Sequence, residues 1–161
     1  MNTTLAEHLR ASRGPSGSAD RIVVIDDDPI ILDVLSGVLR GAGFEHVIGV
    51  NDPRDAFELV TEVDADLVIL DLMMPHVDGY QLLAKLRANE TTRGYLPILV
   101  MTADGSAEAR ALALALEATE VLVKPVGPRY LTRLAGDLLR LRHEARQLPS
   151  ITAQPPVGQL S

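Results

Sequence analysis

Five short apolar runs, each followed by a stretch with helical periodicity, constrain what this chain can fold into. The runs lie at residues 21–25, 46–50, 66–70, 97–101 and 120–124, and the helical stretches lie near 29–41, 53–63, 78–89, 106–117 and 128–146. Strands that alternate with helices are typical of a parallel sheet whose right-handed crossovers cover both faces. The runs are apolar throughout, as expected for strands that are buried on both faces. The sequence therefore predicts an α/β doubly wound parallel sheet.

The two ends of the chain differ in composition from the part between them. Residues 1–20 end in "SRGPSGSAD", and residues 147–161 contain three prolines without apolar periodicity. Segments rich in Gly, Ser and Pro are typical of flexible arms and tails. We expect a flexible N-terminal arm over residues 1–20, one domain over 21–146 and a disordered C-terminal tail over 147–161.

Composition excludes several classes of site. The chain of 161 residues has no cysteine, so disulfides, thiolate metal ligands and thiol nucleophiles are absent. Its four histidines are scattered without the spacing of a zinc site. The net charge of −7 argues against direct DNA binding. No apolar run approaches the ~18 residues of a membrane span, so we expect a cytoplasmic protein that does not bind membranes.

Polar or charged residues stand at the end of every predicted strand. They are Asp26, Asp27, Asp28, Asn51, Asp52, Asp71, Thr102 and Lys124. Ligands of open α/β sheets bind at this carboxyl edge. Capping explains some of these residues singly, since Asp28 and Asp52 each precede a proline that can open a helix. It does not explain three consecutive aspartates.

Charge arithmetic indicates what such a cluster needs. Two carboxylates 4 Å apart repel by roughly 4 kcal/mol at an effective dielectric constant near 20. Lys124 can supply one counter-charge, and the rest must come from a cation or from raised pKa values. Ligation by oxygen atoms alone favours Mg²⁺ or Mn²⁺. A divalent cation beside a hydroxyl and an ammonium group suits phosphoryl transfer.

Four segments, "VVIDDDP", "VILDLMMPHVDG", "PILVMTA" and "VLVKP", resemble the receiver domain of bacterial two-component response regulators. They occur in order, and the resemblance covers roughly residues 21–145. It implies a flavodoxin-like (βα)5 fold with strand order 2-1-3-4-5. It also implies that Asp71 is the phospho-acceptor. The implied metal ligands are Asp26, Asp27, Asp71 and the backbone carbonyl of Met73.

The resemblance assigns roles to further residues. Thr102 and Lys124 would bind the phosphoryl group, with Thr102 as the switch hydroxyl. The Lys124–Pro125 peptide bond would be cis. Met73 and Asp104 would tune dephosphorylation. The chain departs from many receivers at Val121, where a switch aromatic is common.

The implied function is phosphorelay signal transduction. A sensor histidine kinase or a histidine phosphotransfer protein would phosphorylate Asp71, with Mg²⁺ or Mn²⁺ bound. The domain would then switch a surface made by the fourth helix, the fifth strand and the fifth helix, which would bind a downstream protein or a second copy of the chain. We expect no enzymatic activity beyond self-phosphorylation and dephosphorylation. No output motif is visible, so we expect a stand-alone module.

Other interpretations stay open. Val121 is compatible with a pseudo-receiver that works without phosphorylation, and the chain can also be the N-terminal part of a longer regulator. A phosphohydrolase of the haloacid dehalogenase class needs an aspartate where Met73 stands, and a nucleotide-binding domain needs a glycine-rich turn after the first strand. The leucines and alanines of the fourth helix cover more than one of its faces, which fits either an Ala-rich surface helix or a partner surface. We expect the arginines of the fifth helix to be solvated, with a dimer interface or a basic strip that faces a partner as the alternative.

Overall fold

The computed structural model describes residues 20–89 and 94–148. Its strands are β1 (Arg21–Ile25), β2 (His46–Val50), β3 (Leu67–Asp71), β4 (Ile98–Thr102) and β5 (Glu120–Val123). Its helices are α2 (Pro29–Gly41), α3 (Pro53–Glu62), α4 (Gly79–Ala88), α5 (Ala107–Ala115) and α6 (Pro128–Gln147). The predicted arm and tail lie outside the described residues, except for Asp20, Gln147 and Leu148.

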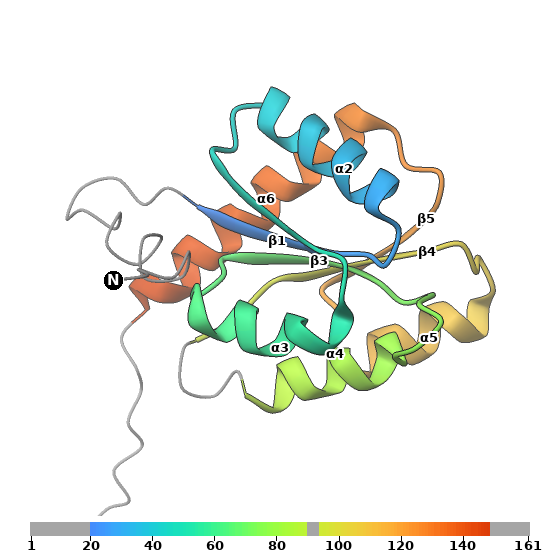
Figure 1. Cartoon of the computed structure of the whole chain (residues 1–161). Coiled ribbons are helices and arrows are strands. Elements are labelled where there is room, and N and C mark those ends of the chain that lie inside the picture. Colours follow the sequence, from blue (N-terminus) through green and yellow to red (C-terminus); the bar gives the residue numbers. More distant parts are fainter. Residues whose placement is uncertain (1–19, 90–93, 149–161) are drawn as a thin grey trace, which may run out of the picture.

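The strands form one parallel sheet in the order β2-β1-β3-β4-β5, which confirms the predicted flavodoxin-like class. Helices α2 and α6 cover one face of the sheet, and α3, α4 and α5 cover the other (Figure 1). Consecutive residues of β1 contribute to different sides: Ile22 and Val24 pack with one buried cluster, and Val23 and Ile25 with the other. This double burial explains why the strands are apolar runs without alternation.

Strand ends differ from the predicted ones by one residue, and the difference concerns the site. Asp71 and Thr102 are the last residues of β3 and β4 rather than the first residues after them. The register pairs Asp71 with Met101 and Thr102 with Val123. Both side chains are therefore positioned by regular sheet structure, which holds them more firmly than a loop would.

Side-chain caps fix the loops at the same edge. Asp28, Asp52 and Asp78 each accept a hydrogen bond from the backbone N–H two residues ahead, at the starts of α2, α3 and α4. Ser106 accepts from the N–H of Ala109 at the start of α5. Each cap satisfies an N–H that the first helical turn leaves without a backbone partner.

One expectation about α6 is wrong. Arg142 is not solvated: its side chain is 1% exposed, and its guanidinium donates to the carbonyl oxygens of Gly94 and Tyr95. Arg146 also turns inward, with Nη1 2.9 Å from a carboxylate oxygen of the buried Asp66. Because the C-terminal end of α6 lies at the amino edge of the sheet, Arg142 and Arg146 face acidic groups in the loop before β3. Across the described parts of the chain, no helix combines the length and the apolar character needed to cross a membrane.

Candidate functional site

The acidic cluster forms where β1 and β3 end. One carboxylate oxygen from each of Asp26, Asp27 and Asp71 lies within 4.8 Å of the other two. Asp26 and Asp71 are buried, and Asp27 is half-buried. Three carboxylates with one side open to solvent are a donor set that suits Mg²⁺, which prefers oxygen ligands and keeps several waters. These residues therefore fit the cation that the sequence predicts.

Lys124 brings a positive charge into this cluster from the end of β5. Its Nζ lies 3.1 Å from Oδ2 of Asp26 and 3.6 Å from Oδ2 of Asp71. The peptide bond between Lys124 and Pro125 is cis, as the resemblance implies. The ammonium group thus lies beside the Asp71 carboxylate, where it can stabilise negative charge.

Opposing effects act on the pKa of the Asp71 carboxyl. Burial raises the pKa of its carboxyl above the usual range, and the neighbouring negative charge of Asp26 acts in the same direction. A hydrogen bond from the backbone N–H of Met73 to Oδ1, 3.1 Å long, and the charge of Lys124 oppose this shift of the pKa. Desolvation is the largest of these effects, so the ionised carboxylate is less favoured here than in water.

Thr102 is buried at the end of β4 and connected to the following turn. Its Oγ1 accepts the backbone N–H of Asp104 at 3.0 Å, and the carboxylate of Asp104 accepts the N–H of Ser106 at 2.9 Å. Hydrogen bonds from Ser106 hold the pKa of Asp104 below its usual range. Asp104 is exposed, and so is the side chain of Met73, so both are accessible to the water that would hydrolyse a phosphoryl group.

Val121 is buried in the core on the α5 side of the sheet. Its backbone carbonyl accepts a hydrogen bond from Arg110 of α5. The side chain is too short to swing between buried and exposed positions as an aromatic ring does. The metal-ligand role of the Met73 carbonyl and the dephosphorylation roles of Met73 and Asp104 stay predictions.

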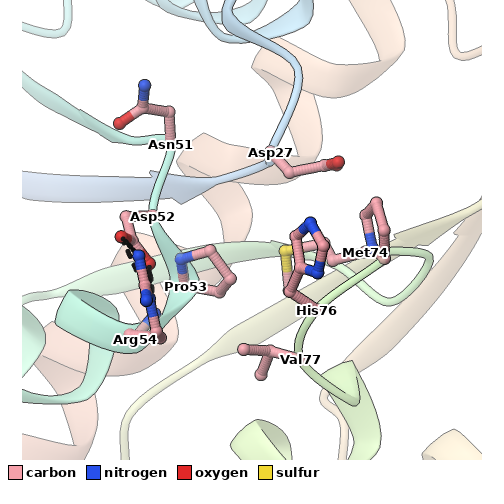
Figure 2. A pocket seen from close by; sticks show the side chains of 9 residues that line it. Asp27, Asn51, Asp52, Pro53, Arg54, Met74, His76 and Val77 are labelled. Atoms are coloured by element: carbon pink, nitrogen blue, oxygen red, sulfur yellow. Dashed lines mark hydrogen bonds and ion pairs between the residues drawn. The ribbon is translucent and has the colours of Figure 1, made fainter.

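A cavity of about 770 Å³ opens beside the cluster, with Asp27 in its wall. Figure 2 shows Asp27 on one side of the pocket, His76 and Met74 from the loop after β3, and Asp52 joined to Arg54. The guanidinium of Arg54 donates to both carboxylate oxygens of Asp52, which holds the pKa of Asp52 at about 2. The exposed edge of the acidic site is therefore open enough to admit a partner's side chain.

The sequence analysis does not predict two arginine contacts: Arg54 with Asp52, and Arg110 with β5. It predicts Asp52 only as a cap, although Arg54, two residues later, signals a local ion pair. For Arg110 the acceptor is a backbone carbonyl, which every residue has, so the sequence offers no comparable signal.

Comparison with known proteins identifies the family of this site. The sequence model described as "Response regulator receiver domain" matches residues 22–135. The chain belongs to the response regulator receiver family. Among curated relatives of this receiver, the DNA-binding response regulator MtrA of Mycolicibacterium smegmatis is 36% identical over 132 residues, and the match covers 81% of our chain and 56% of MtrA. The regulatory protein VanRc of Enterococcus gallinarum is 33% identical over 141 residues, covering 88% of our chain and 58% of VanRc.

Solved structures agree with the fold of the receiver. The chemotaxis protein CheY4 of Vibrio cholerae superposes with a TM-score of 0.68 at 28% identity, covering 74% of our chain and 98% of CheY4. The BeF3-activated N-terminal receiver domain of RstA from Klebsiella pneumoniae has a TM-score of 0.68 at 27% identity, covering 75% and 99%. The chain spans about half the length of the curated relatives it matches.

Proposed function

We propose that this receiver takes a phosphoryl group from a sensor histidine kinase, or from a histidine phosphotransfer protein, onto Asp71. The observation that carries the proposal is the position of Lys124, whose ammonium lies between Asp26 and Asp71 at the edge of a three-carboxylate cluster. An isolated strand-end lysine would be solvated. This one contacts the carboxylate that would react.

The chemistry is an in-line displacement. A carboxylate oxygen of Asp71 forms a bond to phosphorus, the bond between phosphorus and the donor's imidazole nitrogen breaks, and the imidazole leaves. Asp26, Asp27 and Asp71 would hold Mg²⁺ or Mn²⁺, which supplies Lewis-acid stabilisation of the phosphoryl oxygens. Lys124 adds positive charge on the same side. Hydrolysis of the aspartyl phosphate returns the domain to its resting state, and these two self-reactions are the only chemistry proposed for it.

The aspartyl phosphate would act as a switch. The new phosphoryl oxygens would accept hydrogen bonds from Thr102 and Lys124, which stabilises one of two conformers of the β4–α5 turn. The surface that would read this change contains exposed apolar side chains from three elements: Leu112 of α5, Val123 of β5 and Tyr130 of α6. The reader is a downstream protein, a second copy of the chain, or an output domain such as the part of MtrA that the match does not cover.

A second candidate function is a binding module that works without phosphorylation. It is favoured by Val121, whose buried side chain removes the usual aromatic readout. Under this alternative Asp71 would not react with any phosphodonor, although the domain would still fold and bind its partner.

The test is phosphorylation by a small acyl phosphate in the presence of Mg²⁺, followed by intact-mass spectrometry. We expect one added phosphoryl group on the wild type, and none on Asp71→Asn or in the presence of a chelator. Asp28→Asn is the matched control, because it changes the neighbouring aspartate that caps α2 and should be labelled normally. A wild type that gains nothing, even from a phosphorylated histidine kinase, would favour the second candidate.

A further inference from the structure

A chain of hydrogen bonds connects the switch hydroxyl to the first turn of α5. Oγ1 of Thr102 accepts the N–H of Asp104, and the Asp104 carboxylate accepts the N–H of Ser106. Ser106 is the N-cap of α5, and its carbonyl accepts the N–H of Arg110 at 3.2 Å. The hydroxyl that would bind the phosphoryl group and the backbone of Arg110 therefore belong to one continuous network.

The side chain of Arg110 continues this network to the edge of the sheet. Its Nη1 donates to the carbonyl oxygen of Val121 at 2.9 Å, and its Nη2 lies 3.3 Å from Oε1 of Glu120. The same carboxylate oxygen accepts the N–H of Val121 at 3.0 Å. Strand β5 is at the end of the sheet order, so these two side chains bind the backbone groups of Val121 at an edge strand.

This arrangement coincides with the position at which the switch aromatic is missing. Val121 is 3% exposed and packs in the core, whereas the side chain of Arg110 is 51% exposed and spans from α5 to β5. Figure 1 shows α5 leaving the end of β4 and the chain returning into β5. The helix that is hydrogen-bonded through its first turn to Thr102 and the strand that a partner would read are thus joined by one charged side chain.

We propose that Arg110 is a positioning residue that connects the state of Thr102 to the edge of β5, in place of an aromatic at position 121. This inference rests on the proposed function, because it needs a phosphoryl group on Asp71. When the Thr102 hydroxyl turns toward a phosphoryl oxygen, the Asp104–Ser106 turn shifts with it. The first turn of α5 then moves Arg110. This changes the hydrogen bonds that the Arg110 guanidinium donates to the Val121 carbonyl and the Glu120 carboxylate. Coupling between two sites is reciprocal, so a partner bound at β5 would also bias Thr102.

The experiment is amide NMR of the full chain with Mg²⁺ and beryllofluoride, the species that activates the RstA receiver domain and that here stands in for the phosphoryl group. In the wild type we expect shifts both at Thr102 and Asp104 and at Glu120 and Val121. In Arg110→Met, which keeps the aliphatic stem but loses both donors, the shifts at Glu120 and Val121 should fall at least threefold. The shifts at Thr102 and Asp104 should remain.

Two further variants make the result specific. Arg110→Lys retains one donor group and should give an intermediate response at β5. Arg133→Met changes another exposed arginine, on α6, and should leave every response at its wild-type size. The inference is overturned if Arg110→Met keeps the full response at Val121, or if its response at Thr102 is lost as well. A wild type that shows no response at Thr102 would contradict the proposed function itself, and the role of Arg110 would fall with it.

Discussion

At the scale of single residues, the ionised carboxylate of Asp71 lowers the stability of the domain. Burial raises the pKa of its carboxyl, so folding favours the protonated form. The stabilising contribution of the protonated carboxyl is fully present below the pKa of the unfolded chain. It is lost as the pH rises through the higher pKa of the folded state. Burial and the neighbouring charge of Asp26 therefore make the ionised carboxylate an unfavourable form for the folded domain.

We therefore expect Asp71→Asn to raise the free energy of unfolding at pH 7 by about 1 kcal/mol. The measurement is urea unfolding with a chelator present, so that no bound cation contributes. The difference from wild type should shrink as the pH falls through the raised pKa of the folded carboxyl, and it should be gone below the usual pKa of aspartate, because the wild-type carboxyl is then neutral in both states. Asp28→Asn, at a half-buried cap, should change little. An advantage of Asp71→Asn that stayed constant with pH would contradict this explanation.

Gly79, the first residue of α4, permits a close approach of two backbones. A β-carbon at this position would lie 2.6 Å from Cα and 2.8 Å from the carbonyl oxygen of Leu72. Both atoms belong to backbone that follows directly from Asp71, so neither can move without disturbing the site. Any side chain at position 79 therefore displaces the loop after β3.

Gly79→Ala should lower the free energy of unfolding by about 2 kcal/mol and slow labelling of Asp71 by the acyl phosphate. Gly136→Ala, within α6, is the matched control, because a β-carbon there meets no atom within 4 Å. It should stabilise the protein by about 0.5–1 kcal/mol, because alanine is the better helix former. Equal effects of the two substitutions would show that close packing against Leu72 is not the cause.

At the scale of elements, the turn between α5 and β5 contains a strained residue. Glu117 has φ 65°, in the left-handed region that glycine adopts more easily. The sequence here, "LEATEV", lacks the glycine-containing turn common in receivers. The backbone is nevertheless held, because the Glu117 carbonyl accepts a hydrogen bond from Nε of Arg87 at 2.7 Å. Arg87 is buried and also donates to the carbonyl of Leu96, which ties α4 to the start of β4.

Glu117→Gly should therefore raise the midpoint of thermal unfolding, by an amount that corresponds to about 1 kcal/mol. Glu117→Ala is the comparison, since it removes the same carboxylate but keeps a β-carbon at positive φ. It should give none of the gain. If both variants were equally stable, the charge of Glu117 rather than its backbone conformation would explain the result.

Sequence reasoning succeeded for elements whose signals are local. The apolar runs gave the strands, and polar residues at their ends gave Asp26, Asp71 and Lys124, because parallel strands bring their carboxyl ends together. It failed where a contact depends on packing between distant segments. Helical spacing places Arg142 on the face of Leu131 and Leu138, but it does not reveal the groups that would pair with a buried guanidinium. Arg142 is buried against the loop before β3, whereas Arg140 is exposed beside Asp137. The one-residue shift of β3 and β4 reflects backbone pairing, which hydrophobicity does not report.

At the scale of the whole molecule, charge is arranged differently at the two edges of the sheet. At the carboxyl edge, Asp26, Asp27 and Asp71 face Lys124. At the amino edge, the buried Asp66 accepts the backbone N–H of Arg21 and lies beside two arginines, Arg142 and Arg146. The first edge has spare negative charge that a cation would offset. The second edge is an internal ion network that ties α6 to β1 and β3.

This contrast leads to opposite expectations for two variants. Asp27→Asn should barely change the stability of the metal-free protein, but it should abolish the rise in thermal midpoint that Mg²⁺ gives the wild type. For a cation at 100 times its dissociation constant, that rise corresponds to about 2.7 kcal/mol. Arg142→Met should lower the free energy of unfolding by about 3 kcal/mol, because it leaves a buried carboxylate with one partner fewer.

The decisive comparison is the change in thermal midpoint that Mg²⁺ causes in each variant. It is measured by scanning calorimetry with and without the ion. Arg142→Met should keep the full wild-type increment, since its substitution lies at the amino edge and touches none of Asp26, Asp27 and Asp71. Its midpoint should simply start lower. The inference that the two edges are independent would be wrong in two cases. Either Arg142→Met would lose the rise in thermal midpoint that Mg²⁺ gives, or Asp27→Asn would retain that rise. Such a separation would serve the proposed function, because the ion network at the amino edge would offset the stability that the crowded carboxylates at the carboxyl edge cost.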